Sequence, residues 1–120
     1  MKVVVTSIGG GLDSQVDPRF GRASTFVLVD TETDETESID NSSGASAAQG
    51  AGVQAAETVS RLGAECLVTG HCGPKAFRAL QAAGIEIYTG ASGTVAEAIG
   101  QFKLGELQLS TGPDVGGHWG

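Results

Sequence analysis

The stretch that most constrains the fold lies near the amino terminus, where residues 2–8 read KVVVTSI. β-Branched side chains fill most of this run, and an apolar run without polar alternation is typical of a strand buried on both faces. Such a strand lies in the middle of a sheet that carries helices on its faces. The sequence therefore predicts an α/β domain built around this first strand.

The hydrophobic pattern of the 120 residues predicts four more strands and three helices. The helices are expected to begin near Ala48, Pro74 and Thr94, and Gly63 and Gly84 are suitable C-terminal caps for the first two. The further strands are expected at residues 25–30, 36–40, 65–69 and 85–88.

The order of these elements predicts the topology. The first three strands follow one another without a helix and are expected to be antiparallel neighbours, whereas right-handed crossovers bring the fourth and fifth parallel to the first. We therefore expect a ribonuclease-H-like fold, with a five-stranded mixed sheet of order 3-2-1-4-5, strand two antiparallel, flanked by three helices. One domain should span residues 1–107, and residues 108–120 should form a flexible C-terminal tail.

This topology brings four connecting segments to one edge of the sheet, where the parallel strands end. Ligands of open α/β sheets bind outside that edge. The first of the four segments is long and rich in glycine, and long connections of this kind are often functional. The segments are residues 9–22, 41–44, 70–75 and 89–93.

The charge balance excludes some classes of partner. A formal net charge of −7 argues against a nucleic-acid surface and against an anionic membrane surface. Six of the fourteen carboxylates lie between Asp30 and Asp40, in a hairpin expected at the opposite end of the molecule. Cations flank two of the converging segments, so the molecule should be electrically polarised. These cations are Arg19, Arg22, Lys75 and Arg78.

Cysteine usage and hydropathy bear on the cellular compartment. No apolar run approaches the ~20 residues needed to cross a bilayer, and the amino terminus does not resemble a secretory signal. A secreted disulfide framework would have more cysteines than Cys66 and Cys72. We therefore expect a cytoplasmic protein with reduced thiols, and a buried Cys66 within a strand.

Segment 70–75 carries the side chains best suited to chemistry. Its helix start, Gly73 followed by Pro74, offers free N–H groups and the positive end of a helix dipole to an anion, although such a pair is also simply a good helix initiator. His71 and Cys72 are expected to be exposed, but no second Cys/His pair completes a zinc site. Cys72 is a candidate nucleophile because it precedes a helix start, and the alternative is that neither residue carries chemistry.

The predicted topology does not imply nuclease activity. Ribonuclease-H-type nucleases hold two metal ions with carboxylates, one of them in the middle of the first strand. Residues 3–8 contain no acidic side chain, and Asp13 and Asp17 lie beyond the strand. We expect the fold without that chemistry, since a fold alone does not carry a function.

Four short motifs occur in the order found in one known family: FGRA at residues 20–23, GAGVQAA at 50–56, GxxGPKAFxAL at 70–80 and AAGI at 82–85. From residue 1 to about 105 the chain resembles the dinitrogenase iron–molybdenum cofactor biosynthesis family, which includes the NifX and NafY carriers and the C-terminal part of NifB. The resemblance implies a ribonuclease-H-like fold without nuclease activity.

The resemblance also implies a ligand. One small stand-alone member of the family, similar to this chain in length, holds a mixed molybdenum–copper sulfide cluster non-covalently. We therefore expect a non-enzymatic carrier with a basic, glycine-lined pocket for a molybdenum–copper sulfide cluster, or alternatively for an iron–molybdenum or iron–sulfur cluster. Carriers of the family use a histidine in a comparable loop, which His71 matches, and Cys72 is the second candidate metal ligand. The expected cofactor-binding residues are Gly9, Gly10, Gly11, Arg19, Arg22, Asn41, Gly70, His71, Cys72, Gly73, Lys75 and Gly90.

Two functions of other classes remain open. The acidic hairpin and the tail would suit an adaptor that docks a protein partner, such as an ATPase or the recipient of the cluster, with the basic pocket incidental or regulatory. A thiol enzyme centred on Cys72 is the third possibility. His118 and Trp119 in the tail lie either in solvent or over the site as a lid.

Overall fold

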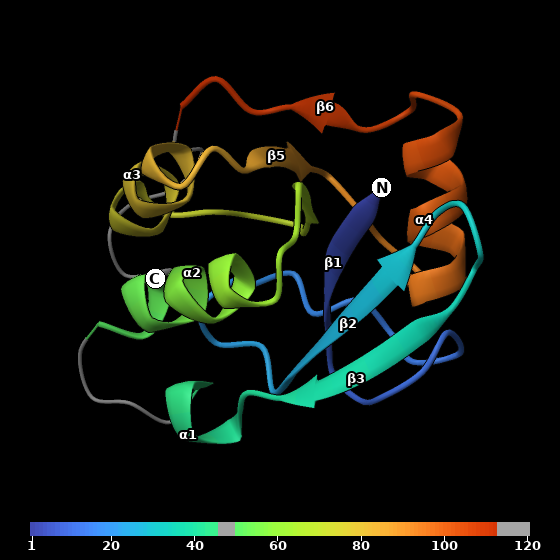
Figure 1. Cartoon of the computed structure of the whole chain (residues 1–120), viewed down its shortest axis with the longest axis horizontal. Coiled ribbons are helices and arrows are strands. Elements are labelled where there is room, and N and C mark those ends of the chain that lie inside the picture. The colour runs from blue at the N-terminus through green and yellow to red at the C-terminus, as the bar shows by residue number, and fades with distance from the viewer. Residues whose placement is uncertain (46–49, 113–120) are drawn as a thin grey trace.

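The computed structural model describes residues 1–45 and 50–112 of the chain. A mixed sheet of six strands runs through the molecule in the order β3-β2-β1-β4-β5-β6, with helices on its faces (Figure 1). The strands are β1 (Lys2–Ser7), β2 (Thr25–Asp30), β3 (Thr36–Asp40), β4 (Cys66–Val68), β5 (Glu86–Thr89) and β6 (Gln108–Leu109). The helices are the one-turn α1 (Ser42–Ala45) and the longer α2 (Ala51–Arg61), α3 (Pro74–Ala82) and α4 (Val95–Lys103).

The predicted arrangement of the first five strands is confirmed. β1 pairs antiparallel with β2 and parallel with β4, and β4 pairs parallel with β5. The prediction of five strands is wrong, because Gln108 and Leu109, which fall within the predicted tail, pair antiparallel with Thr89 and Tyr88 as β6. This pairing supplies partners for backbone groups at the edge of β5. Two residues are too few to show the alternation by which a strand is detected in a sequence.

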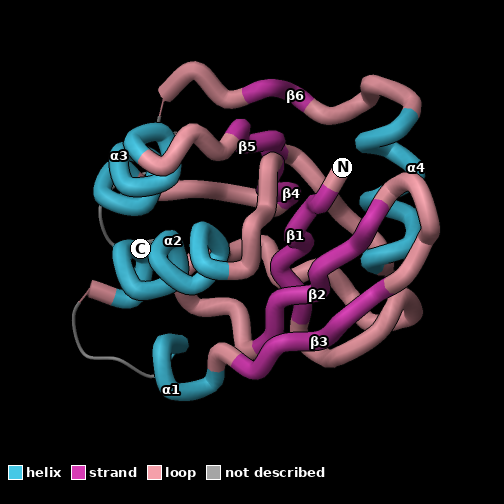
Figure 2. The backbone as a smooth tube through the Cα atoms, viewed as in Figure 1, coloured by secondary structure: helices cyan, strands magenta, loops and turns pink. Residues whose placement is uncertain are grey.

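The two faces of the sheet carry different helices. α2 and α3 lie side by side on one face and α4 lies on the other (Figures 1 and 2). Side chains of β1 alternate between the two cores, with Val4 on the α2/α3 side and Val3 and Val5 on the α4 side, and all three are fully buried. Burial of one such side chain is worth roughly 1.5–3 kcal/mol. The prediction of a first strand buried on both faces is therefore confirmed.

The start of α2 is set by a close approach of two backbones. The helix begins at Ala51 and follows Gly50, whose φ of 73° is left-handed, whereas the predicted start near Ala48 lies outside the described residues. A Cβ placed on Gly21 would come within 2.8 Å of the Gly52 nitrogen and 2.9 Å of its Cα. The glycines near this helix start are therefore needed where the loop before β2 crosses it.

Replacement of Gly21 by alanine should destabilise the fold by about 1–3 kcal/mol, because the added methyl group meets backbone atoms that cannot move independently. The matched control is Gly100→Ala in α4, where an added Cβ meets nothing within 4 Å. That substitution should stabilise the fold by about 0.5–1 kcal/mol, because glycine is unfavourable inside a helix. Urea unfolding of both variants gives the two free energies of unfolding, and equal values for the two would contradict this account of Gly21.

Candidate functional site

Loop segments from distant parts of the chain meet where β1 and β4 end, as the topology predicted. The His71 N–H donates to the Pro18 carbonyl at 2.7 Å, and the Phe20 N–H donates to the His71 carbonyl at 3.4 Å. The Gly90 N–H donates to the Gly70 carbonyl at 3.2 Å, which joins the loop after β5 to the loop after β4. Backbone hydrogen bonds thus fix three of the four predicted segments to one another.

The fourth segment is held by a buried amide. Asn41 follows β3, and its N–H donates to the Ser24 carbonyl at 2.8 Å while its side-chain amide donates to the Ala23 carbonyl at 2.8 Å. Asn41 is buried, with 6 % of its surface exposed. Because both hydrogen bonds are internal to the protein, Asn41 has a structural role at the border of the predicted site.

A buried polar network supports the loop beneath Arg19. The Thr6 hydroxyl lies 2.7 Å from the Asp17 carbonyl, to which it donates, and 2.8 Å from the Thr69 hydroxyl. The Asp17 carboxylate accepts the Arg19 N–H at 3.0 Å and lies 3.5 Å from the Arg19 Nε. Asp17 is 5 % exposed, so its charge is held within the protein beside a cation that reaches solvent. The network fixes where the Arg19 side chain leaves the loop.

His71 and Cys72 lie in different environments. His71 is exposed, whereas Cys72 is 1 % exposed and packs in the core between the sheet and α2/α3. The expectation that both side chains are exposed is therefore wrong for Cys72. A thiol is a small apolar side chain and is among those most often buried. Of the two predicted metal ligands, only His71 lies at the surface of the described structure.

The glycines of the first loop are partly used by the protein itself. The Gly9 N–H donates to the Ser7 hydroxyl at 3.3 Å, and the Gly11 N–H donates to the Ser38 hydroxyl at 3.1 Å. These two groups are therefore less available to a ligand than the sequence suggested. Gly70 has a steric role, because a Cβ there would lie 2.7 Å from the Pro18 Cα.

The end of the sheet where these loop segments meet is called the loop end below. Cations gather near it, but positive and negative charges are separated less completely than predicted. Arg19 and Lys75 are exposed, and Arg22 is half-buried. Asp40 pairs with Thr25 in the sheet and therefore lies at the loop end, not at the hairpin end with the other acids of its cluster. Hydrogen bonds from the Ser42 N–H, which has the larger effect, and from the Ser42 hydroxyl hold the pKa of the Asp40 carboxyl below its usual value.

The three longer helices begin differently. α4 begins with a capping box, in which the Glu97 N–H donates to the Thr94 hydroxyl at 3.1 Å and the Thr94 N–H donates to the Glu97 carboxylate at 2.9 Å. The Thr94 N–H, and after it the Thr94 hydroxyl, lower the pKa of the Glu97 carboxyl. α2 and α3 each follow a glycine, Gly50 and Gly73, and have no side-chain cap. The first N–H groups of a helix lack partners within it, and those of α2 and α3 have no N-cap side chain to accept them.

The start of α2 was not among the predicted site residues. Its signal in the sequence is the glycine at the N-cap, followed by Gly52, where a Ser, Thr, Asp or Asn would be expected to cap a helix. The start lies against Gly21, beside Arg22. We therefore add it to the candidate site, which comprises the starts of α2 and α3 and the cations near them.

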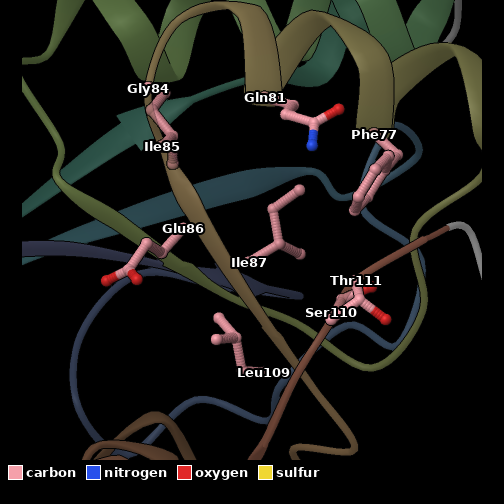
Figure 3. A pocket seen from close by; sticks show the side chains of 9 residues that line it. All are labelled: Phe77, Gln81, Gly84, Ile85, Glu86, Ile87, Leu109, Ser110 and Thr111. Atoms are coloured by element: carbon pink, nitrogen blue, oxygen red, sulfur yellow. The ribbon is translucent and has the colours of Figure 1, made fainter.

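Among the hollows lined by described residues are three that contain no predicted site residue. The first, of about 380 Å³, lies between α3 and β5–β6, where Phe77 and Gln81 of α3 face Ile87 of β5 (Figure 3). The others, of about 420 and 390 Å³, lie beside the hairpin and between the outer sides of α2 and α3.

The described residues limit metal chemistry and membrane insertion. Within residues 1–45 and 50–112 there is no group of three or more His, Cys, Asp or Glu side chains arranged to hold a metal ion. No helix in the same part of the chain is long and apolar enough to cross a membrane.

This chain is similar to known proteins both in its sequence and in its fold. A family model described as dinitrogenase iron-molybdenum cofactor matches residues 1–105. The apo form of the orange protein from Desulfovibrio gigas has a TM-score of 0.92 and 45 % identity, over 95 % of this chain and 96 % of that chain. A NifB candidate from Thermotoga has a TM-score of 0.80 and 36 % identity, over 90 % and 91 %. An uncharacterized protein of Methanocaldococcus jannaschii is 28 % identical over 112 residues, covering 90 % of this chain and 94 % of that protein.

Both thiols should react slowly with a disulfide reagent such as Ellman's reagent at about pH 8, because the reagent needs an accessible thiolate. Cys66 and Cys72 are each 1 % exposed, and burial, followed by the charges of Glu86 and Glu65, raises the pKa of Cys66 to about 11. In denaturant, both thiols should react rapidly with the same reagent. Cys66→Ala isolates Cys72, and rapid reaction of that single thiol in the folded variant would restore Cys72 as a candidate nucleophile.

Proposed function

Because the chain belongs to the dinitrogenase iron-molybdenum cofactor family, as its four motifs predicted, we propose that it binds and carries an anionic metal–sulfur cluster without catalysing a reaction. The metals we propose are molybdenum with copper or with iron. The similarity to the apo form of the orange protein supports a carrier that exists with and without its ligand. The cluster is then cargo, bound in the cell interior and passed to a protein recipient.

The observation that carries this proposal is the pair of uncapped helix starts on one side of the sheet. A helix start is equivalent to roughly half a positive charge and presents N–H donors to an anion. Arg19, Arg22 and Lys75 add full charges nearby, in a chain whose net charge is −7. The third helix start at this end is closed by Glu97. An anion is therefore favoured on the α2/α3 side.

Metal–sulfur clusters suit a site with few protein ligands, because their sulfides complete the coordination of the metals. His71 is exposed beside Arg19, with which it forms a backbone bridge, and can supply one direct ligand. Cys72 can join it only if the loop moves, since its side chain lies in the core. Gly10, Gly73 and Gly90 remain proposed lining residues, where backbone can approach the sulfides closely.

Reconstitution tests the proposal. Protein prepared under exclusion of oxygen is mixed with tetrathiomolybdate and a copper salt. A visible charge-transfer absorption should appear and should co-elute with the protein in gel filtration. Arg19→Gln and Lys75→Gln should each weaken binding by roughly 2- to 5-fold, the worth of an exposed charge pair. The affinity should also fall with added salt, which screens such charges.

The matched control is Arg61→Gln, which removes one cation at the carboxyl-terminal end of α2, where Arg61 donates to the Thr58 hydroxyl at 3.3 Å. Its affinity should equal that of the unaltered chain. The proposal is wrong if no band co-elutes with the protein. The assignment of the site is wrong if Arg61→Gln weakens binding as much as Arg19→Gln.

A second candidate function, a protein adaptor, is favoured by the exposed acidic hairpin. Glu32, Asp34, Glu35 and Glu37 are exposed there, and Lys103 lies 3.1 Å from the Asp34 carboxylate. Such a surface suits a basic patch on a partner such as an ATPase or the cluster recipient.

The adaptor function and the carrier function can be separated by pull-down from a cell extract. If the hairpin is the docking surface, exchange of Glu35 and Glu37 for Gln abolishes capture of the partner, and His71→Ala leaves it intact. Capture that depends on His71 and on the loaded cluster, but not on the hairpin, would reject the adaptor function and support the carrier.

A further inference from the structure

Two sulfur atoms and a carboxylate meet at the end of the sheet away from the candidate site. The Cys66 thiol lies 3.7 Å from the Met1 thioether sulfur and 3.9 Å from the Glu86 Oε1. The register of the sheet brings them together, since Val3 pairs with Cys66 and Cys66 pairs with Glu86. Alternation places Met1 on the same face as Val3. Figure 2 shows β1, β4 and β5 as neighbours, with the amino terminus at one end.

The separations suit a single bridging ion. Two sulfur atoms that each lie about 2.3 Å from one metal can be at most about 4.6 Å apart, and the two sulfurs here are closer than that. Thiolate and thioether donors select soft cations such as Cu(I) over Mg²⁺ or Ca²⁺. A monovalent ion neutralises the thiolate of Cys66, which is 1 % exposed, while the exposed Glu86 carboxylate keeps its charge at the surface.

The surroundings favour a cation. Glu65 and Glu86 flank Cys66, and Glu65 accepts the Lys2 N–H at 3.0 Å. Asp30 and Glu32 lie 3.9 and 3.6 Å from the amino-terminal nitrogen and pair with its positive charge, so the carboxylates that favour a further cation are Glu65 and Glu86. Met1 is 44 % exposed and its sulfur lies against the buried thiol, so rotation of the Met1 side chain would give an ion access to Cys66.

We propose that Met1 Sδ, Cys66 Sγ and Glu86 Oε1 form a binding site for one soft monovalent cation of the Cu(I) type, separate from the site at the loop end. On binding, a Cys66 sulfur–metal bond forms and the S–H bond breaks, and the proton passes to water. The metal keeps its oxidation state. This inference does not rest on the cluster-binding function, because none of the three residues belongs to the loop-end site.

Met1 is the sole methionine of the chain, which makes a direct test available. In the full-length protein labelled with [methyl-¹³C]methionine, the single methyl signal should shift on addition of Cu(I), supplied without oxygen as its acetonitrile complex, and the shift should be complete at one equivalent. Cys72→Ala keeps the sulfur pair and should behave in the same way. In Cys66→Ala, the addition of Cu(I) should not shift the methyl signal.

Competition with bicinchoninate gives the affinity. Cys66→Ala should weaken Cu(I) binding by more than about 100-fold, since even residues that only support metal ligands are worth 10- to 100-fold. Cys66→Ser preserves the size of the side chain and should show the same loss, which guards against a loss caused by unfolding. An unchanged methyl signal at one equivalent, or an equal shift in folded Cys66→Ser, would overturn the proposal.

Discussion

Pro18 crosses the end of β4 so closely that its Cα lies 2.7 Å from where a Cβ of residue 70 would be. Glycine at that position lets the loop after β1 lie directly on the loop after β4. Two backbone hydrogen bonds, from His71 to Pro18 and from Phe20 to His71, then hold the loops together. The positions of Arg19 and His71 at the surface follow from this contact, since neither loop has a regular secondary structure of its own.

The parts of the fold that the sequence predicted are those with a local or repetitive signal. The β-branched run of β1 indicated burial on both faces, because a long apolar stretch excludes a solvent-facing side. The start of α3 at Pro74 and that of α4 after Thr94 have known chemical signatures and lie where they were expected. The convergence of the loops followed from topology, which depends on strand order and not on any single residue.

The parts that the sequence did not predict depend on tertiary surroundings. Whether Cys72 faces solvent or the core is set by the turn that it occupies, and a thiol is compatible with either. Asp40 stands at the loop end because the register of β3 carries it there, although it is close in sequence to the hairpin acids. Gln108 and Leu109 form a strand because the edge of β5 lies beside them.

The parallel pairing of β1 with β4 has a consequence for how the molecule is assembled. Val4 pairs with Leu67, which lies beyond the midpoint of the 120-residue chain. Both must have left the ribosome before the central pair of strands can form. Contacts between residues so far apart in sequence form late and slowly, because closing the intervening loop costs entropy first. The β1–β3 meander can form earlier. The loop end is formed only with the complete sheet, so a ligand offered during synthesis meets no formed site there before β4 has joined β1.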